Sequence, residues 1–111
     1  MSEYDPNDLR GQEQDRAERA RQERIAREQE RSDLKWLMGS KRGRRIVWRL
    51  LAQSGLFSST FVSDALALAF AEGRRHYGGK ILQAIHEDCP ELYPVMVKET
   101  KHDDADDRAA E

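Results

Sequence analysis

The large apolar residues of this chain are concentrated in its middle part. Residues 1–32 contain only Met1, Tyr4, Leu9 and Ile25, whereas residues 33–99 contain 25 residues of the types Leu, Ile, Val, Met, Phe, Tyr and Trp. Because a folded domain needs a continuous apolar interior, the core must come from residues 33–99. A domain of this size buries only about 60% of its unfolded surface, so we expect marginal stability or a stabilising partner.

Charge and hydropathy place the chain among soluble proteins. Charged residues make up 36% of the sequence and apolar residues 38%, and the formal net charge is −2. No stretch approaches the ~18 consecutive apolar residues of a membrane span, and the first residues lack the basic and apolar regions of a signal peptide. We therefore expect a soluble protein that no recognisable signal exports. The single cysteine, Cys89, excludes an internal disulfide and a multi-cysteine metal site.

The first 32 residues have the composition of a charged helical arm. Residues 12–31 consist almost entirely of Glu, Gln, Arg and Ala, which favour helices, and Glu23 precedes Arg27 at the spacing of a helical ion pair. Gly11 weakens the continuity of this helix. No apolar heptad repeat is present, which argues against a self-pairing coiled coil. The arm is either solvated or partly disordered, or it becomes ordered on a partner.

Two helices are predicted at the start of the middle segment. A short helix or turn is expected over residues 34–38, because a Ser-Asp cap precedes it and a glycine follows it. Ser40 can cap a second helix through Ser54, and Gly55 then stands where a left-handed C-cap belongs. The apolar residues of this second helix recur at helical spacing: Ile46, Val47, Leu50 and Leu51.

The third and longest helix is predicted from Ser63 or Asp64 to about Glu87. Its Gly-Gly pair at 78–79 favours either close packing or a break, and we predict one continuous helix. The apolar residues of this helix lie four or seven positions apart: Leu66, Phe70, Tyr77, Ile81 and Ile85.

The end of the chain is predicted to contain one short helix and a tail. Pro90 and Pro94 are tolerated only near a helix beginning, so a short last helix is expected after them. Residues 100–111 are polar and acidic and are predicted to form a disordered tail. No segment alternates with the period of a strand. The predicted fold class is therefore all-α: an arm over residues 1–32, a domain of three to four short helices over residues 33–99, and the tail.

Motifs of common enzymes and cofactor sites are absent from the sequence. It contains no GxxxxGK[ST], GxGxxG, HExxH or CxxC pattern, and the acidic tail lacks the spacing of a calcium loop. Cys89 follows His86 by three residues, as a nucleophile and its base could, but a small residue at a helix junction is the ordinary occupant of such a position. We expect no enzyme activity, no cofactor and no metal site. The histidines are not spaced as metal ligands: His76, His86 and His102.

The strongest positive signal is an interval without carboxylates. Residues 34–63 contain six basic side chains and no Asp or Glu, although the whole chain is net acidic. Such residues solubilise exposed helix faces, neutralise phosphates or meet an acidic protein surface, and arginine suits both anions. Trp36 and Trp48 flank the cluster and are expected in the core rather than stacked on bases. The candidate partner- or phosphate-binding residues are Lys35, Lys41, Arg42, Arg44, Arg45, Arg49, Arg74 and Arg75.

Several segments of the middle region together have a recognisable pattern. They are Asp33-Leu34-Lys35-Trp36-Leu37-Met38, Gly43-Arg44-Arg45, Val47-Trp48-Arg49-Leu50-Leu51, Phe70-Ala71-Glu72-Gly73-Arg74-Arg75 and Cys89-Pro90-Glu91-Leu92-Tyr93, with Met96 and Glu99. Over about residues 33–99 the chain resembles a family of small virion-associated structural proteins of short-tailed bacteriophages. The resemblance implies a phage context and association with the virion near the head, the portal or the ejected internal proteins. It implies no catalytic residue.

Three functions remain open at this point. The first is a virion structural or accessory protein that binds portal or internal ejection proteins, in many copies on a symmetric assembly. It would reside in the virion, and in the host cytoplasm during assembly. The second is a phage DNA-binding protein whose arginine-rich helix contacts the phosphates of packaged DNA. The third is an assembly factor or regulator that is absent from mature particles.

Overall fold

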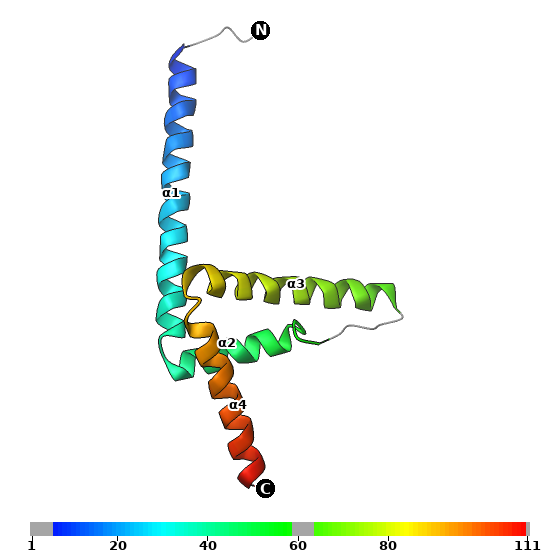
Figure 1. Cartoon of the computed structure of the whole chain (residues 1–111). Coiled ribbons are helices and arrows are strands. Elements are labelled where there is room, and N and C mark those ends of the chain that lie inside the picture. Colours follow the sequence, from blue (N-terminus) through cyan, green and yellow to red (C-terminus); the bar gives the residue numbers. More distant parts are fainter. Residues whose placement is uncertain (1–5, 59–63, 111) are drawn as a thin grey trace. The chain divides into compact units, whose positions relative to one another are not determined.

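The computed structural model describes residues 6–58 and 64–110, and within these ranges every regular element is a helix. The chain divides into two compact units, residues 1–32 and residues 33–111, each of which is described by itself. The all-α prediction is confirmed. The suggested cap at Ser63 and the last residue of the predicted tail lie outside the described ranges. The helices, drawn in Figure 1, are α1 (Pro6–Met38), α2 (Lys41–Gln53), α3 (Ala65–Asp88) and α4 (Leu92–Ala110).

Helix α1 contains both the predicted arm helix and the predicted short turn. The prediction of a separate element over residues 34–38 was wrong, because the helix passes through Ser32 and Asp33 without a break. Strong helix formers on both sides outweigh the few tenths of a kcal/mol that such residues cost inside a helix. In the first unit the side chains of residues 12–32 are exposed, and Arg21 pairs with Glu18 at 2.9 Å.

Helix α2 begins and ends as its capping residues predict. The Ser40 Oγ accepts a hydrogen bond from the Gly43 N–H at 3.0 Å, which satisfies one of the free amides of the first turn. Gly55 has a φ of 77°, the left-handed conformation that glycine adopts after a helix. Gly43 is buried, and a Cβ there would lie 2.8 Å from the carbonyl carbon of Leu37. A glycine is therefore required where α2 turns back from the end of α1.

Helix α3 is continuous through its glycine pair, as predicted. Asp64 caps it by accepting a hydrogen bond from the Leu66 N–H at 3.3 Å, and the helix ends at Asp88, one residue beyond the predicted end. Gly78 is buried against α2, where an added Cβ would lie 2.6 Å from the Ser54 Cβ. Close packing of the two helices therefore explains this glycine.

Helix α4 replaces the predicted short helix and disordered tail. It runs to Ala110, so the prediction of disorder over the described part of residues 100–111 was wrong. Two carboxylates of this segment have partners: His102 lies 3.3 Å from Asp106, and Lys41 of α2 lies 3.7 Å from Asp103. These partners reduce the repulsion that would otherwise unwind the segment.

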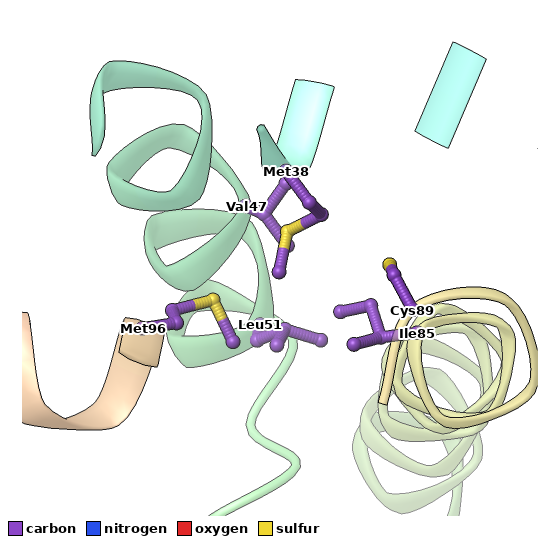
Figure 2. Packing of buried hydrophobic residues seen from close by; sticks show 6 residues of the cluster. All are labelled: Met38, Val47, Leu51, Ile85, Cys89 and Met96. Carbon is purple, nitrogen blue, oxygen red and sulfur yellow. The ribbon is translucent and has the colours of Figure 1, made fainter. Parts of the chain in front are cut away.

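The core of the second unit lies where α2, α3 and α4 meet the end of α1. Figure 2 shows the buried side chains converging from these elements, with Val47 and Leu51 of α2 at the centre. Ile85 comes from α3 and Met96 from α4. Leucines and aromatic residues pack around this cluster, so the predicted core of residues 33–99 is the one observed. The buried residues of this core cluster are Met38, Val47, Leu51, Ile85, Cys89 and Met96.

Candidate binding surface

Arg44, the most buried of the predicted contact residues, is held inside the domain. Its side chain is only 12% exposed and forms a forked pair with Glu99 of α4: Nη2 donates to Oε1 at 2.7 Å, and Nε donates to Oε1 and Oε2 at 3.1 and 3.2 Å. Nη1 donates to the Met38 carbonyl at 2.8 Å, at the end of α1. Arg44 therefore joins three helices, in contrast to the outward role predicted for it.

The start of α2 faces the acidic end of α4. Lys41 lies 3.7 Å from Asp103, and both side chains are about half-exposed. Arg45 lines the same shallow hollow as Lys41, together with Asp103, Asp106 and Asp107. Part of the predicted basic surface is thus neutralised by carboxylates of the chain's own last helix.

The other exposed side of α2 has no such compensation. Arg42, Ile46, Arg49 and Gln53 follow one another at intervals of three and four residues, so they form one row along the helix. All four are exposed. Within residues 6–58 and 64–110, no carboxylate lies within ion-pair distance of Arg42 or Arg49. This row is the part of the predicted surface that remains available to an anion outside the domain.

A groove of about 620 Å³ lies between α2 and α3, beside this row. Its walls are mainly apolar, and among the described residues that line it Arg74 is the only charged one. The guanidinium of Arg74 stacks over Phe70 at 5.7 Å from the ring centroid, a cation–π arrangement. The lining residues are Leu50, Gln53, Ser54, Ala69, Phe70, Gly73, Arg74, Tyr77 and Ile81.

The remaining predicted contact residues lie apart from the groove. Lys35 is exposed in the last turn of α1. Arg75 is half-buried and lines a separate hollow that also contains Glu72 and His76. The structure therefore divides the predicted residues into Arg44 inside the domain, Lys41 and Arg45 beside the acidic end of α4, and the others on exposed helix faces.

The two tryptophans have different environments. Trp48 packs against the core and stacks with Phe57 at a centroid distance of 5.2 Å. Trp36 is 81% exposed, so the expectation that it belongs to the core was wrong. Its position near the end of α1 points its ring away from the buried side that Met38 and Leu34 form.

Cys89 is a core residue. Its side chain is 1% exposed, and burial raises the pKa of the Cys89 thiol above its ordinary value. The carboxylates of Glu91 and Asp88 raise this pKa further, whereas the charge of Lys35 lowers it. The His86 ring packs against the Tyr93 ring at 5.0 Å. The thiol is therefore held in its neutral form, which is the less nucleophilic one.

Two features of this surface were not found from the sequence. The pairing of Glu99 with Arg44 spans 55 positions, and no local spacing rule reports on it. The groove is lined by Phe70 and Tyr77, which belong to the predicted apolar row of α3 but are 72% and 68% exposed. Helix α3 has 24 residues and α2 only 13, so α2 cannot cover the whole apolar row of α3; the difference between the two predicted helix lengths was the available signal.

Fold and surface together define a small all-α protein whose central helix presents arginines beside an apolar groove. None of the helices described is both long and apolar enough to cross a membrane. The chain belongs to the family of Bbp19-like phage proteins, whose sequence profile matches residues 34–98. The matched region extends from the last turn of α1 into α4 and contains the whole core. The comparisons found no matching curated protein and no matching solved structure.

Proposed function

We propose that this phage protein is a non-enzymatic component of the virion that binds other virion proteins. Family membership gives the phage context. The observation that carries the proposal is that Arg42 and Arg49 lie exposed on α2 beside a groove whose described lining residues include no carboxylate. Buried apolar contact with a rim of unpaired cations is the composition of a protein-binding surface. The partners are portal, head or internal ejection proteins.

The exposed part of α1 supports the same function. Its residues 12–32 carry charge on all sides and no apolar stripe, so this segment has no requirement to pack within the domain. A long charged helix gains affinity by lying on a neighbouring subunit. In a symmetric assembly, many such weak contacts add up through effective concentration.

Mass spectrometry of purified particles of the encoding phage tests the proposal. We expect this chain in the virion at a reproducible copy number, and its absence from mature particles would overturn the proposal in favour of an assembly factor. Charge reversal at Arg42 and Arg49 to Glu is expected to lower incorporation severalfold. The matched control reverses Lys98 and Lys101, which are exposed on α4, and is expected to leave incorporation unchanged.

DNA binding is the second candidate function, because the same arginines could contact phosphates. Arg42, Arg49 and Arg74 have no acidic partner within ion-pair distance among the described residues. If they bind duplex DNA, the affinity falls steeply with salt, and replacing Arg42 and Arg49 by Ala lowers the salt slope by about 2. Binding that is absent or insensitive to salt would remove this candidate.

A further inference from the structure

The groove between α2 and α3 exposes more large apolar surface than a helical domain of this size needs. Phe70 and Tyr77 are 72% and 68% exposed, and Leu50 on the opposite wall is 49% exposed. Leu66, at 81%, extends the same surface toward the start of α3. Contiguous apolar surface of this kind, as opposed to single exposed residues, marks a site of interaction.

Gly73 lies within this surface, and no contact among the described residues explains why this position is a glycine. Gly78, on the same helix, is needed because Ser54 lies against it, but a Cβ added at Gly73 would have no atom of residues 6–58 or 64–110 within 4 Å. A glycine in a helix interior costs about 1 kcal/mol relative to alanine. The absence of a side chain at Gly73 leaves room for another chain to approach the backbone of α3 closely.

The exposed residues of α3 form a row that fits a helix. Leu66, Phe70, Gly73 and Tyr77 are spaced by four, three and four residues, the pattern of a helix-packing ridge. From Leu66 to Ile81 the row is about 22 Å long at ~1.5 Å per residue. A partner helix of about four turns would cover it and would form the third side of a three-helix packing with α2 and α3.

The charges around the groove select the partner. Within the part of the chain that the structure describes, Arg74 is the only charged residue that lines it. Arg42 and Arg49 belong to the adjoining row on α2, which reaches the groove through Gln53. A second copy of this chain that docked by the same groove would bring a second Arg74 to the interface, which adds like charge to a partly desolvated site. A helix with carboxylates beside its apolar stripe places opposite charges there.

We propose that the α2–α3 groove binds an amphipathic helix of another protein, one whose apolar stripe is flanked by Asp and Glu. This groove belongs to the surface on which the proposed function rests, and the inference adds what kind of partner it binds; it does not require that the chain is retained in the virion. The test below uses purified components, so its failure and the failure of the virion proposal are distinguishable.

The test is a binding titration of the full chain with two synthetic helical peptides of about 18 residues. Both carry Leu at alternating intervals of three and four residues; one has Glu on both flanks of the stripe and the other has Lys. By fluorescence anisotropy at about 0.15 M salt, the Glu peptide is expected to bind saturably and at least tenfold more tightly than the Lys peptide.

Variants locate the binding in the groove. Phe70→Ala combined with Tyr77→Ala, and separately Gly73→Leu, are each expected to weaken the Glu peptide about tenfold, and Arg74→Gln severalfold. Leu68→Ala is the matched control, because Leu68 is exposed on α3 but lies off this row and does not line the groove. It is expected to bind as the unaltered chain does. Circular dichroism verifies that each variant keeps its helices. We expect it to do so, because the altered positions are exposed.

Three results would overturn the proposal. They are no saturable binding of the Glu peptide, equal binding of both peptides, and binding that the groove variants leave unchanged. Sedimentation equilibrium without peptide tests the alternative that a second copy of the chain fills the groove. A dimer that is abolished by combining Phe70→Ala with Tyr77→Ala would show this. A monomer at the same concentrations supports a partner of another sequence.

Discussion

Arg44 shows how one residue can have a role opposite to the one that its neighbours indicate. It belongs to a run of basic residues, yet its guanidinium is enclosed by Glu99 and by the carbonyl of Met38. A sequence reports the charge of each residue but not which member of the run the fold turns inward. Arg42 and Arg45, on either side of it, are exposed.

Replacing Arg44 by Ala is expected to lower the free energy of unfolding by about 2–4 kcal/mol. The change leaves Glu99 partly buried without its partner and the Met38 carbonyl without its donor. Arg44→Lys keeps the charge but loses the forked geometry, so we expect an intermediate loss. Urea unfolding measures both. Arg42→Ala is the control, expected within about 0.5 kcal/mol, and an equal effect at positions 42 and 44 would contradict the assignment.

The glycines of α3 allow a paired comparison on one helix. Gly73→Ala is expected to raise the free energy of unfolding by about 0.5–1 kcal/mol, because the helix gains propensity and the new Cβ has no described neighbour within 4 Å. Gly78→Ala is expected to lower it by about 1–3 kcal/mol, because its Cβ overlaps the Ser54 side chain. Thermal and urea unfolding measure both changes. A stabilising Gly78→Ala would show that α2 and α3 are not in close contact there.

The buried thiol of Cys89 gives the protein an alkaline limit of stability. Burial raises the pKa of Cys89 in the folded chain above that in the unfolded chain. The stabilisation from the neutral, buried thiol is therefore fully present below the pKa of the unfolded chain, about 8.5. It is lost as the pH rises through the higher pKa of the folded chain. Between about pH 8 and 10, the free energy of unfolding is expected to fall more steeply with pH for the unaltered chain than for Cys89→Ala. Identical slopes would contradict this, as would rapid alkylation of the folded chain.

At the scale of elements, capped helix ends were easier to predict than the extent of α4. Ser40 and Asp64 are caps because their side chains accept hydrogen bonds from amides two or three residues ahead, a local property that the sequence states directly. The extent of α4 depends instead on partners such as Lys41, which lies 62 residues before Asp103. Acidic composition alone therefore predicted a disordered tail where a helix is found.

The carboxylates of α4 are expected to oppose the binding of polyanions by α2. Replacing Asp103, Asp106 and Asp107 by Asn removes the charges that face Lys41 and Arg45, so the salt concentration that elutes the chain from heparin should rise. The matched control changes the net charge equally in the arm, with Asp15→Asn, Glu23→Gln and Glu28→Gln. It is expected to produce a smaller rise. Equal shifts would show that net charge alone, and not the facing of α2 and α4, sets the affinity.

At the scale of the whole molecule, the sequence predicts the fold class and the core well and the surface less well. Core residues such as Leu51 and Ile85 were identified because helical periodicity reports on burial. The same periodicity cannot separate residues that face the chain's own core from residues that face a groove, as Phe70 and Tyr77 show. The distinction depends on the relative lengths of the packed helices, since α3 has 24 residues and α2 only 13.

The link between Arg44 and Glu99 also has a consequence for synthesis on the ribosome. Its two ends are separated by 55 positions, and the acidic member is in the final helix. A nascent chain that has released only its first three helices has an arginine with no counter-charge and an interior without Met96. The domain can therefore close only after the residues of α4 have left the ribosome, because both the counter-charge and Met96 lie there.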